Sequence, residues 1–419
     1  MTREHGSDAS RPLTGTPLAG VRVIELGTMI AAPFASHLLS QLGADVVKIE
    51  PPTGDTTRAL VRGGPSGTFI AYNHGKKSFA IDLASTDGAD VFRRLVATAD
   101  VVVHNLSPAA TRKLGIARAD LSAVNPRLIY CHIRGYGPGP QHEDLATNPV
   151  AEASTGVMDD HRIDGRPSRL GPSYHDQFAG AYAVIRVLAA LMRREVLTPD
   201  ERYIEIGLYE TGLHVAGRDL AGLQLKTQLL GRAEKEAGGE FAMPGYGAYE
   251  ASDGRWIYLL VLTDAHWNRL ATALQMDEGE DPALTRLRDR KRQRERVEAA
   301  IRAAVGCRDF DAVAARLRDA GVGFAEVLPL ERVLEAPQAR HAGKLRPLAF
   351  DGINFEVPEF PGGGAVVAGL PPPHLGEHTV ELMRTLGFGA EARDRLLRTG
   401  AVFEAGDDLL RWTRPTVAP

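Results

Sequence analysis

The sequence predicts a protein of the α/β class, with a parallel sheet in its N-terminal half and a smaller second domain. Short apolar runs alternate with helical stretches through the first half, as in successive βαβ units. From about Leu225 this alternation ends and helical segments predominate. A chain of 419 residues is long enough for two or three domains with substantial cores.

The elements of the first half follow in a regular order. We expect strands at residues 21–26, 45–50, 79–83, 100–105, 127–133 and 203–208. The first helix, at 33–43, has proline in its first turn and glycine at its end. Further helices are expected around 89–97, around 109–114 and within 171–195, where apolar residues recur at helical spacing.

The second domain is expected to be smaller and to span residues 226–334. It contains one clear strand, 254–262, after an Asp-Gly turn, and helical segments at 264–274, 284–305 and 310–321. Residues 17–225 form the large domain, and 335–419 form a C-terminal segment with a further helix after a proline run. Residues 1–16 are polar and lack an apolar core, so we expect a flexible tail and not a secretory signal.

The composition is ordinary for a soluble enzyme, and we expect a cytoplasmic location. The chain is 44% apolar and 24% charged, with a net charge of −4, so neither nucleic acid nor a membrane surface is an expected partner. No run of about 18 apolar residues is present. The two cysteines, Cys131 and Cys307, cannot form a disulfide framework or a metal-ligand motif, so we expect a reducing compartment and no metal.

Three conspicuous motifs are better explained without chemistry. The glycine-rich 135–140 has prolines where a dinucleotide fingerprint would open a helix, so we expect a plain turn and not a nicotinamide dehydrogenase. The acidic 158–165 is interpreted as a solvated loop, and the basic 286–296 as a solvated helix face. A G-x-S-x-G serine motif is absent.

Asp176 stands just before the long apolar helix, and its position has two interpretations. As a helix cap, its carboxylate would accept backbone N–H bonds and contribute about 1 kcal/mol. As a nucleophile, it would be ionised at neutral pH and could attack an acyl group without a neighbouring base. Exposed N–H groups of the helix could then stabilise an oxyanion. The pattern alone favours the cap and leaves the catalytic role open.

Several longer stretches change this balance. They include "PLAGVRVIELGTMIAAPFASHLLSQLGADVVKIEPPTGDTTR" (17–58), "DQFAGAYAVIRVLAALMRR" (176–194) and "LGEHTVELMRTLG" (375–387), with others at 73–83, 99–116, 125–137 and 249–259. Together they closely resemble the family III CoA-transferases. That family includes formyl-CoA and carnitine CoA-transferases, alpha-methylacyl-CoA racemases and an intramolecular CoA-transferring isomerase.

The resemblance implies a Rossmann-like, doubly wound large domain, completed by the C-terminal segment, with the smaller α+β domain inserted between. It also implies an interlocked homodimer. Asp176 falls on the family's catalytic aspartate, which forms a mixed anhydride with an acyl group and then an aspartyl-CoA thioester. Coenzyme A and acyl-CoA would be substrates, with a carboxylic acid as acceptor and no permanently bound cofactor.

The resemblance also implies a coenzyme A site. Its residues come from the loop after the first strand, the end of the third strand, an N-[FL]-x-P turn and the following helix: Met29, Ile30, Ala31, Ile81, Asp82, Leu83, Asn105, Leu106, Ser107 and Lys113. Helix N-termini and cations attract the phosphates of coenzyme A. Lys76 and Lys77 are further candidates, although surface lysines are the commoner interpretation.

The sequence departs from its relatives at informative positions. Ile30 replaces a Gln of some transferases, Pro51 replaces an Arg, and the mobile glycine loop is reduced to 236–241. The racemases pair the aspartate with a His, but Thr147 and Asn148 stand there, so a second proton carrier is missing. We therefore expect a CoA-transferase. An acyl-CoA isomerase, a racemase and a CoA-binding protein without catalysis remain as alternatives.

Overall fold

The computed structural model describes residues 17–61, 66–231, 243–341, 343–350, 352–362 and 370–404. These residues divide into two compact units, one from the described parts of 1–216 and 342–419 and the other from the described parts of 217–341. The N-terminal tail expected at 1–16 and the glycine-containing segment 236–241 lie outside the described residues. Within the described residues, none of the helices is both long and apolar enough to cross a membrane.

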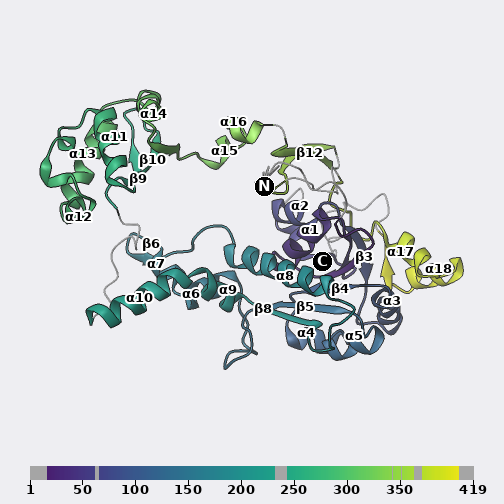
Figure 1. The fold of residues 1–419 in the computed structure, drawn as a ribbon. Helices are drawn as coiled ribbons and strands as arrows, with labels where there is room; N and C mark the ends of the chain where they lie inside the picture. Colours follow the sequence, from purple (N-terminus) through teal and green to yellow (C-terminus); the bar gives the residue numbers. More distant parts are fainter. Residues whose placement is uncertain are drawn as a thin grey trace, which may run out of the picture. The chain divides into compact units, whose positions relative to one another are not determined.

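A seven-stranded sheet forms the centre of the first unit (Figure 1). Its order is β14-β3-β2-β1-β4-β5-β8, and all neighbours are parallel except β14, which pairs antiparallel with β3. The strands are β1 (Arg22–Leu26), β2 (Asp45–Glu50), β3 (Lys77–Ile81), β4 (Val101–His104), β5 (Ile129–Arg134), β8 (Tyr203–Gly207) and β14 (Val402–Phe403). The expected α/β class with a mainly parallel sheet is confirmed.

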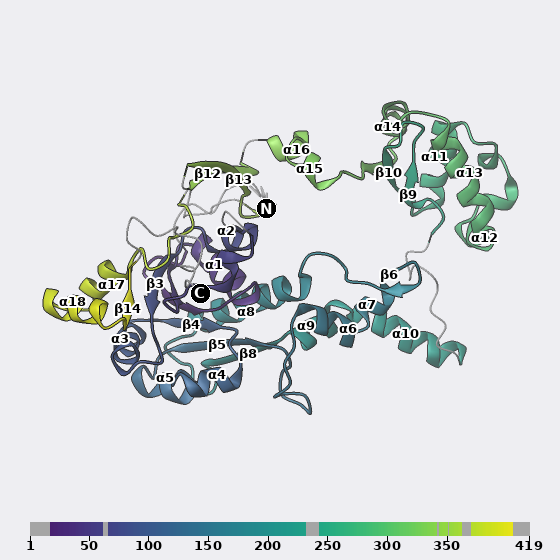
Figure 2. The ribbon, with the colours of Figure 1, turned by 180° about the vertical axis from the view of Figure 1, so that it is seen from behind.

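Helices cover both faces of this sheet because alternate residues of each strand are apolar on opposite sides. Val23 of β1 packs with α1 (Ala31–Gln41) and α8 (Tyr174–Met192), whereas Ile24 and Leu26 pack on the other face. That other face is covered by α3 (Thr86–Val96), α5 (Arg118–Val124), α17 (Thr379–Thr385) and α18 (Ala390–Arg398). Figure 2, the view from behind, shows the same two layers.

The strand order reverses between β1 and β4. β1 pairs with β2 on one side and β4 on the other, so the loops after β1 and β4 leave the sheet in opposite directions. In open α/β sheets, ligands bind outside the carboxyl ends of the strands at such a switch point. The strand order therefore predicts a ligand site at the loops after β1 and β4.

The remaining elements of the first unit are short. They are α2 (Gly67–Asn73), α4 (Pro108–Lys113), α6 (Asn148–Ser154), α7 (Val157–Asp160), α9 (Leu208–Val215), the two-residue strands β6 (Arg162–Ile163) and β7 (Arg166–Pro167), the hairpin β12 (Leu345–Phe350) and β13 (Ile353–Pro358), and the 3-10 turn η1 (Thr56–Ala59). Strand β14 comes from the end of the described chain, so the C-terminal segment adds an edge to the sheet.

The second unit has its own core. An antiparallel sheet of β9 (Tyr246–Glu250), β10 (Trp256–Leu260) and β11 (Gly323–Glu326) packs on helical segments through apolar residues such as Ile257, Trp267 and Leu317. The helices are α10 (Gly217–Leu230), α11 (Asp264–Leu274), α12 (Leu287–Arg292), α13 (Arg294–Gly306), α14 (Phe310–Asp319), α15 (Leu330–Val333) and α16 (Pro337–Arg340).

Two sequence interpretations need correction here. The helix expected over 284–305 is broken, since α12 ends at Arg292 and α13 begins at Arg294. The basic run within it is not wholly a solvated face. Arg290 is fully buried, donates to Asp264 Oδ1 at 2.8 Å and lies over the Trp267 ring. One charge of the run is therefore structural.

Candidate active site

A cavity of about 330 Å³ lies at the carboxyl ends of the central strands. It is lined by residues that follow β1, β2, β3 and β4, among them Gly27, Asp55, Ile81, Asp82, Leu83 and Leu106. Its wall is mainly apolar, with Leu114 from the end of α4 closing one side. A site at this edge of a parallel sheet can hold an extended ligand that has apolar and polar parts.

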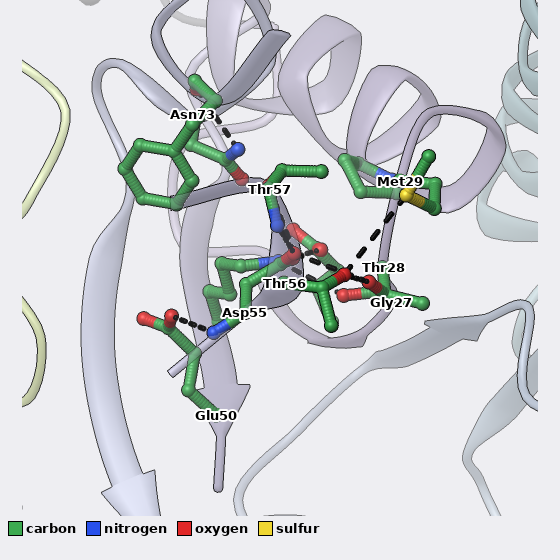
Figure 3. A network of polar contacts seen from close by, with 12 residues as sticks. Gly27, Thr28, Met29, Glu50, Asp55, Thr56, Thr57 and Asn73 are labelled. Atoms are coloured by element: carbon green, nitrogen blue, oxygen red, sulfur yellow. Dashed lines mark hydrogen bonds and ion pairs between the residues drawn. The ribbon is translucent and has the colours of Figure 1, made fainter. Parts of the chain in front are cut away.

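The loop after β1 forms one wall of this cavity, and side chains from two other loops hold it. Thr28 N–H donates to Asn105 Oδ1 at 3.0 Å, and Asn105 Nδ2 donates back to the Thr28 carbonyl at 2.8 Å. The Thr28 hydroxyl donates to Asp55 Oδ1 at 3.1 Å. Figure 3 shows Thr28 between Asp55 and the start of α1. The Asn105 side chain therefore positions the loop through both its amide oxygen and its amide nitrogen.

Buried charges support this loop from below. Lys48 Nζ lies 2.8 Å from both Glu25 Oε1 and Asp55 Oδ2 and donates to the Gly27 carbonyl at 2.9 Å. Lys76 Nζ lies 2.6 Å from Glu25 Oε2. Burial opposes ionisation of Asp55, but the charge of Lys48 outweighs it and lowers the Asp55 pKa to about 2. The loop is thus supported by the buried ion pairs among Glu25, Lys48, Asp55 and Lys76.

This arrangement corrects the surface interpretation of Lys76. The lysine is almost fully buried, and burial lowers its pKa to about 8 although Glu25 opposes this. Its ammonium group also donates to the Pro33 carbonyl and to Asn73 Oδ1. Lys77 is half-exposed and pairs with Asp45 at 3.1 Å. Both lysines are occupied by protein partners.

Asp176 lies in the first turn of α8, but it does not cap the helix. The cap comes from Asn148 of α6, whose Oδ1 accepts the N–H groups of His175 (2.9 Å) and Asp176 (3.3 Å). Buried Glu152 accepts from the Asn148 amide and from Leu170 N–H. Among the residues that the structure describes, the Asp176 carboxylate accepts no hydrogen bond. It is half-buried.

The electrostatic setting of Asp176 is unusual. Burial raises its pKa to about 7; Arg169 opposes this rise, and the carboxylate of Glu152 adds to it. When a carboxylate is buried without hydrogen-bond donors, the free-energy cost of removing its charge from water is not offset. Its charged form is therefore destabilised and more reactive. Strong perturbation of this kind is typical of functional residues.

The turn that carries Asp176 lies beside the start of α1. Helix α8 packs along α1, and a Cβ atom on Gly180 would lie 2.9 Å from the Ala31 carbonyl, so only glycine permits this approach. Gln177 Nε2 donates to the Tyr72 hydroxyl at 2.9 Å. The two helices also lie side by side in Figures 1 and 2. The loop after β1 thus adjoins both the cavity and the Asp176 turn.

The two helix starts differ in the N–H groups that they leave unpaired. In α8, the amides of Tyr174, His175, Asp176 and Gln177 donate to Pro172, Asn148 and Ser173. In α1, the amides of Ala31 and Ala32 donate to none of the described residues, and Pro33 has no N–H. Among the described residues, the N–H groups without an acceptor therefore lie at the start of α1 and not at the start of α8, and they belong to buried residues.

Comparison with known protein families decides the affiliation. The model of CoA-transferase family III matches residues 18–379. The chain belongs to CoA-transferase family III. This confirms the resemblance found in the sequence.

Individual members of family III are similar over shorter stretches. The chain is 34% identical to the succinyl-CoA–L-malate CoA-transferase beta subunit of Chloroflexus aurantiacus and 34% identical to the succinate–glutarate CoA-transferase of Agrobacterium fabrum. These matches cover 63% and 62% of the chain, and 66% of each relative, so the matched region is slightly under two thirds of their length.

Two solved structures extend the likeness over most of the chain. A CaiB/BaiF family protein from Brucella suis is 28% identical, with a TM-score of 0.76 over 88% of this chain and 99% of that one. Rv3272 from Mycobacterium tuberculosis is 25% identical, with a TM-score of 0.76 over 89% of this chain and all of that one.

The family III site residues expected from the sequence fall into two groups. Ile81, Asp82, Leu83 and Leu106 line the cavity, and Ser107 caps α4 beside it. Asn105 reaches the cavity only through Thr28, and Lys113 is exposed next to the cavity residue Leu114. The second group, Met29, Ile30 and Ala31, lies where the loop meets α1. Gly180, four residues after Asp176 on α8, packs against Ala31.

Sequence reasoning missed the residues that hold these groups. Glu152 was not considered, and Asn148 was noted only as a departure from the racemases. Asp55 lies in the "TGDTTR" segment that carried the family III resemblance, but its partner Lys48 is in a strand. Such contacts join residues far apart in the sequence, so periodicity does not reveal them.

A Glu152→Gln variant tests whether Glu152 sets the protonation of Asp176. Removal of the neighbouring negative charge should lower the pKa of Asp176, by about half a pH unit to one unit. The change is measured from infrared carboxylate bands as a function of pH, with Asp176→Asn to assign the band. Glu143→Gln, which removes an exposed charge, should leave the titration where it is. An unchanged titration in Glu152→Gln contradicts the role.

Proposed function

We propose that the protein transfers coenzyme A from an acyl-CoA donor to a carboxylic acid acceptor, with Asp176 as the covalent nucleophile. The observation that carries the proposal is the half-buried Asp176 carboxylate, which accepts no hydrogen bond from any described residue and has a pKa raised to about 7. Near neutral pH it is substantially ionised, so it can attack a thioester without a general base.

The chemistry runs through two covalent states. The Asp176 carboxylate attacks the thioester carbonyl, the C–S bond breaks, and a mixed anhydride and CoA thiolate form. The thiolate then attacks the aspartyl carbonyl, which releases the donor acid and leaves an aspartyl-CoA thioester. The acceptor carboxylate repeats both steps in reverse. The amides of Ala31 and Ala32, which donate to none of the described residues, are the proposed donors to the oxyanions.

Coenzyme A is proposed to enter as a substrate, without any permanently bound cofactor. Its nucleotide end would occupy the cavity lined by Ile81, Asp82, Leu83 and Leu106, and its pantetheine arm would follow Met29 and Ile30 toward Asp176. The loop after β1 adjoins both places, which supports this path. The names of the relatives include succinate, malate and glutarate, so dicarboxylic acids are the acceptors to test first.

We also propose an interlocked homodimer in the cytoplasm. Apolar side chains are exposed on two helices, on α8 at Phe178, Ile185 and Met192 and on α10 at Leu223, Leu225 and Leu229. Exposed apolar stretches of this extent support a partner surface. The two cysteines are free thiols, which suits a reducing compartment.

The alternatives within the fold make different demands. A racemase needs a second proton carrier, but Thr147 and Asn148 stand at that place, and the Asn148 amide is engaged by His175, Asp176 and Glu152. An intramolecular isomerase would use Asp176 in the same way and would need no external acid. The two are separated from a transferase by their products.

The deciding experiment is a panel of acyl-CoA donors and carboxylic acids, with the products identified by mass spectrometry. A transferase forms a new thioester that depends on the added acid. Movement of CoA within one dicarboxylic molecule marks an isomerase, and exchange of the α-proton in heavy water without a new thioester marks a racemase. Bound CoA without any turnover contradicts catalysis. Borohydride reduction of the loaded enzyme should mark Asp176 if the covalent route holds.

A Lys113→Gln variant tests the orientation of coenzyme A. Lys113 is exposed beside the cavity, so its ammonium group should attract a phosphate of the nucleotide. We expect CoA affinity, measured by calorimetry, to fall about three- to tenfold at low salt, with a smaller difference at high salt. Lys291→Gln, an exposed lysine on α12, is the matched control. Equal affinities in both variants and the wild type exclude the contact.

A further inference from the structure

Arg169 is a cation beside the candidate nucleophile that the proposed reaction does not use. It lies in the segment between β7 and α8, and its side chain is exposed. Arg169 forms no hydrogen bond or ion pair with the residues that the structure describes. Many arginines of the first unit, such as Arg58 and Arg118, have carboxylate partners. An unpaired guanidinium is available to an anionic ligand.

The backbone around Arg169 is held in place on both sides. Ser168 N–H donates to the His161 carbonyl at 2.8 Å, and Leu170 N–H donates to Glu152 Oε2 at 3.2 Å. The backbone of Arg169 is therefore held in place by its two neighbours in the loop. Only its side chain is free to adapt to a ligand.

Helix α6 holds the backbone next to Arg169 and the backbone of Asp176 through two of its side chains. Glu152 and Asn148 are four residues apart on α6 and are hydrogen-bonded to each other. Glu152 holds Leu170, and Asn148 holds His175 and Asp176. Side chains four residues apart on a helix are neighbours, about 5–6 Å between their Cβ atoms. The loop therefore turns back on itself and brings residues 169–170 beside the start of α8.

The negative charges near Asp176 mean that a substrate with two carboxylates needs a cation nearby in order to bind. Glu152 is a fully buried carboxyl group next to Asp176, and Arg169 is the cation that acts on Asp176 most strongly. An acid with a second carboxylate would bring another negative charge to this place. Without a cation to receive it, that charge would be repelled.

We propose that Arg169 binds the distal carboxylate of a dicarboxylic acid substrate, a specificity role that rests on the CoA transfer proposed above. One carboxylate of the acid would face Asp176, and the other would pair with the guanidinium. The contact discriminates dicarboxylic from monocarboxylic acids, because only the former have the group that Arg169 receives. Its planar pair of donors matches a carboxylate better than an ammonium would.

The test compares acids of equal length on the full-length protein. Succinate and glutarate are assayed as acceptors against butyrate and valerate, with propionyl-CoA as donor, so that each acid gives a new thioester of distinct mass that is measured by mass spectrometry. In Arg169→Gln, the KM for succinate and glutarate should rise about tenfold or more, with kcat changed much less. The KM for butyrate and valerate should stay within about twofold of wild type. Arg169→Lys should recover part of the loss.

The control is Arg166→Gln, which removes the same charge from an exposed position three residues away in β7. It should leave all four KM values near wild type. Equal losses for mono- and dicarboxylic acids in Arg169→Gln, or equal effects of the two variants, overturn the proposal. A wild-type protein that accepts only monocarboxylic acids overturns the role of Arg169 and leaves CoA transfer intact. A wild-type protein that forms no new thioester with any acid overturns both.

Discussion

An Asp176→Asn variant is expected to lose turnover by roughly 10³-fold or more while it still binds acyl-CoA. The amide has nearly the shape of the carboxylate but cannot form the anhydride. The Asp176 side chain makes no hydrogen bond to the described residues, so its replacement breaks no contact that holds the loop. Turnover is measured by thioester exchange, and acyl-CoA binding by calorimetry.

The pH dependence of the wild-type enzyme should follow the same group. The pKa of Asp176 is raised from 3.8 to about 7 by burial, so the ionised nucleophile becomes abundant only near neutral pH. We expect kcat/KM to rise about tenfold per pH unit below pH 7 and to level off above it. Glu152→Gln should move this limb to lower pH, since it removes a charge that opposes ionisation.

The same shift links Asp176 to stability. The folded protein binds this proton more tightly than the unfolded chain, so ionisation of Asp176 opposes folding between pH 4 and pH 7. Asp176→Asn should therefore gain stability relative to wild type as the pH rises through this window, by about 1–3 kcal/mol at pH 8. At pH 4 the two proteins should unfold at similar denaturant concentrations.

The control for this set is Asp144→Asn, which neutralises an exposed carboxylate in the loop after β5. It should retain turnover, acyl-CoA affinity and the wild-type pH profile. Full turnover in Asp176→Asn would exclude the covalent route. Loss of acyl-CoA binding together with turnover would instead show that the side chain acts in binding.

Much of the sheet could be predicted because each strand is a short apolar run that can be recognised from its own sequence. The expected strands 21–26 and 45–50 nearly coincide with β1 and β2, since apolar β-branched residues fill both faces of a covered parallel strand. The short helices α6 and α7 were not anticipated. They carry little apolar periodicity. The clearest feature of α6 is the set of hydrogen bonds that Asn148 and Glu152 make with each other and with the segment before α8.

The role of Asp176 shows where sequence reasoning stops. An acidic residue in the first turn of a helix is usually interpreted as a cap. Here the cap is Asn148, which lies 28 residues upstream, and the Asp176 carboxylate has no hydrogen-bond partner among the described residues. Only the tertiary structure can show that the expected partner of a carboxylate is already occupied. The resemblance to family III supplied the catalytic hypothesis, which the pattern alone did not favour.

The buried charges were hidden for a related reason. Glu25 and Lys48 stand in strands whose alternation predicts one side chain in the core and the next outside. Both faces of this sheet are covered, so both charges are buried. They are stable there because β1 and β2 lie side by side and bring the two groups to 2.8 Å. Their pairing depends on strand order, which the sequence does not state.

A Lys48→Met variant is expected to be destabilised by about 3–5 kcal/mol. Methionine fills the space of the stem, but Asp55 loses its cation, and Glu25 keeps only Lys76. A buried carboxylate without a partner costs several kcal/mol, whereas an isolated surface pair contributes about 0–1 kcal/mol. Lys77→Met, on the neighbouring strand β3, removes a half-exposed pair and should cost less than about 1 kcal/mol. Urea unfolding gives both values.

The loop after β1 makes this a test of function as well. Lys48 also holds the Gly27 carbonyl and fixes Asp55, which in turn holds Thr28. CoA affinity should therefore fall with stability in Lys48→Met, even under conditions where the variant is folded. Adding Asp55→Asn removes one uncompensated charge and should restore part of the stability, whereas the loop, still without the Lys48 contact to the Gly27 carbonyl, should keep its weakened affinity for CoA. A Lys48→Met protein as stable as Lys77→Met would mean that the ion set does not hold this part of the fold.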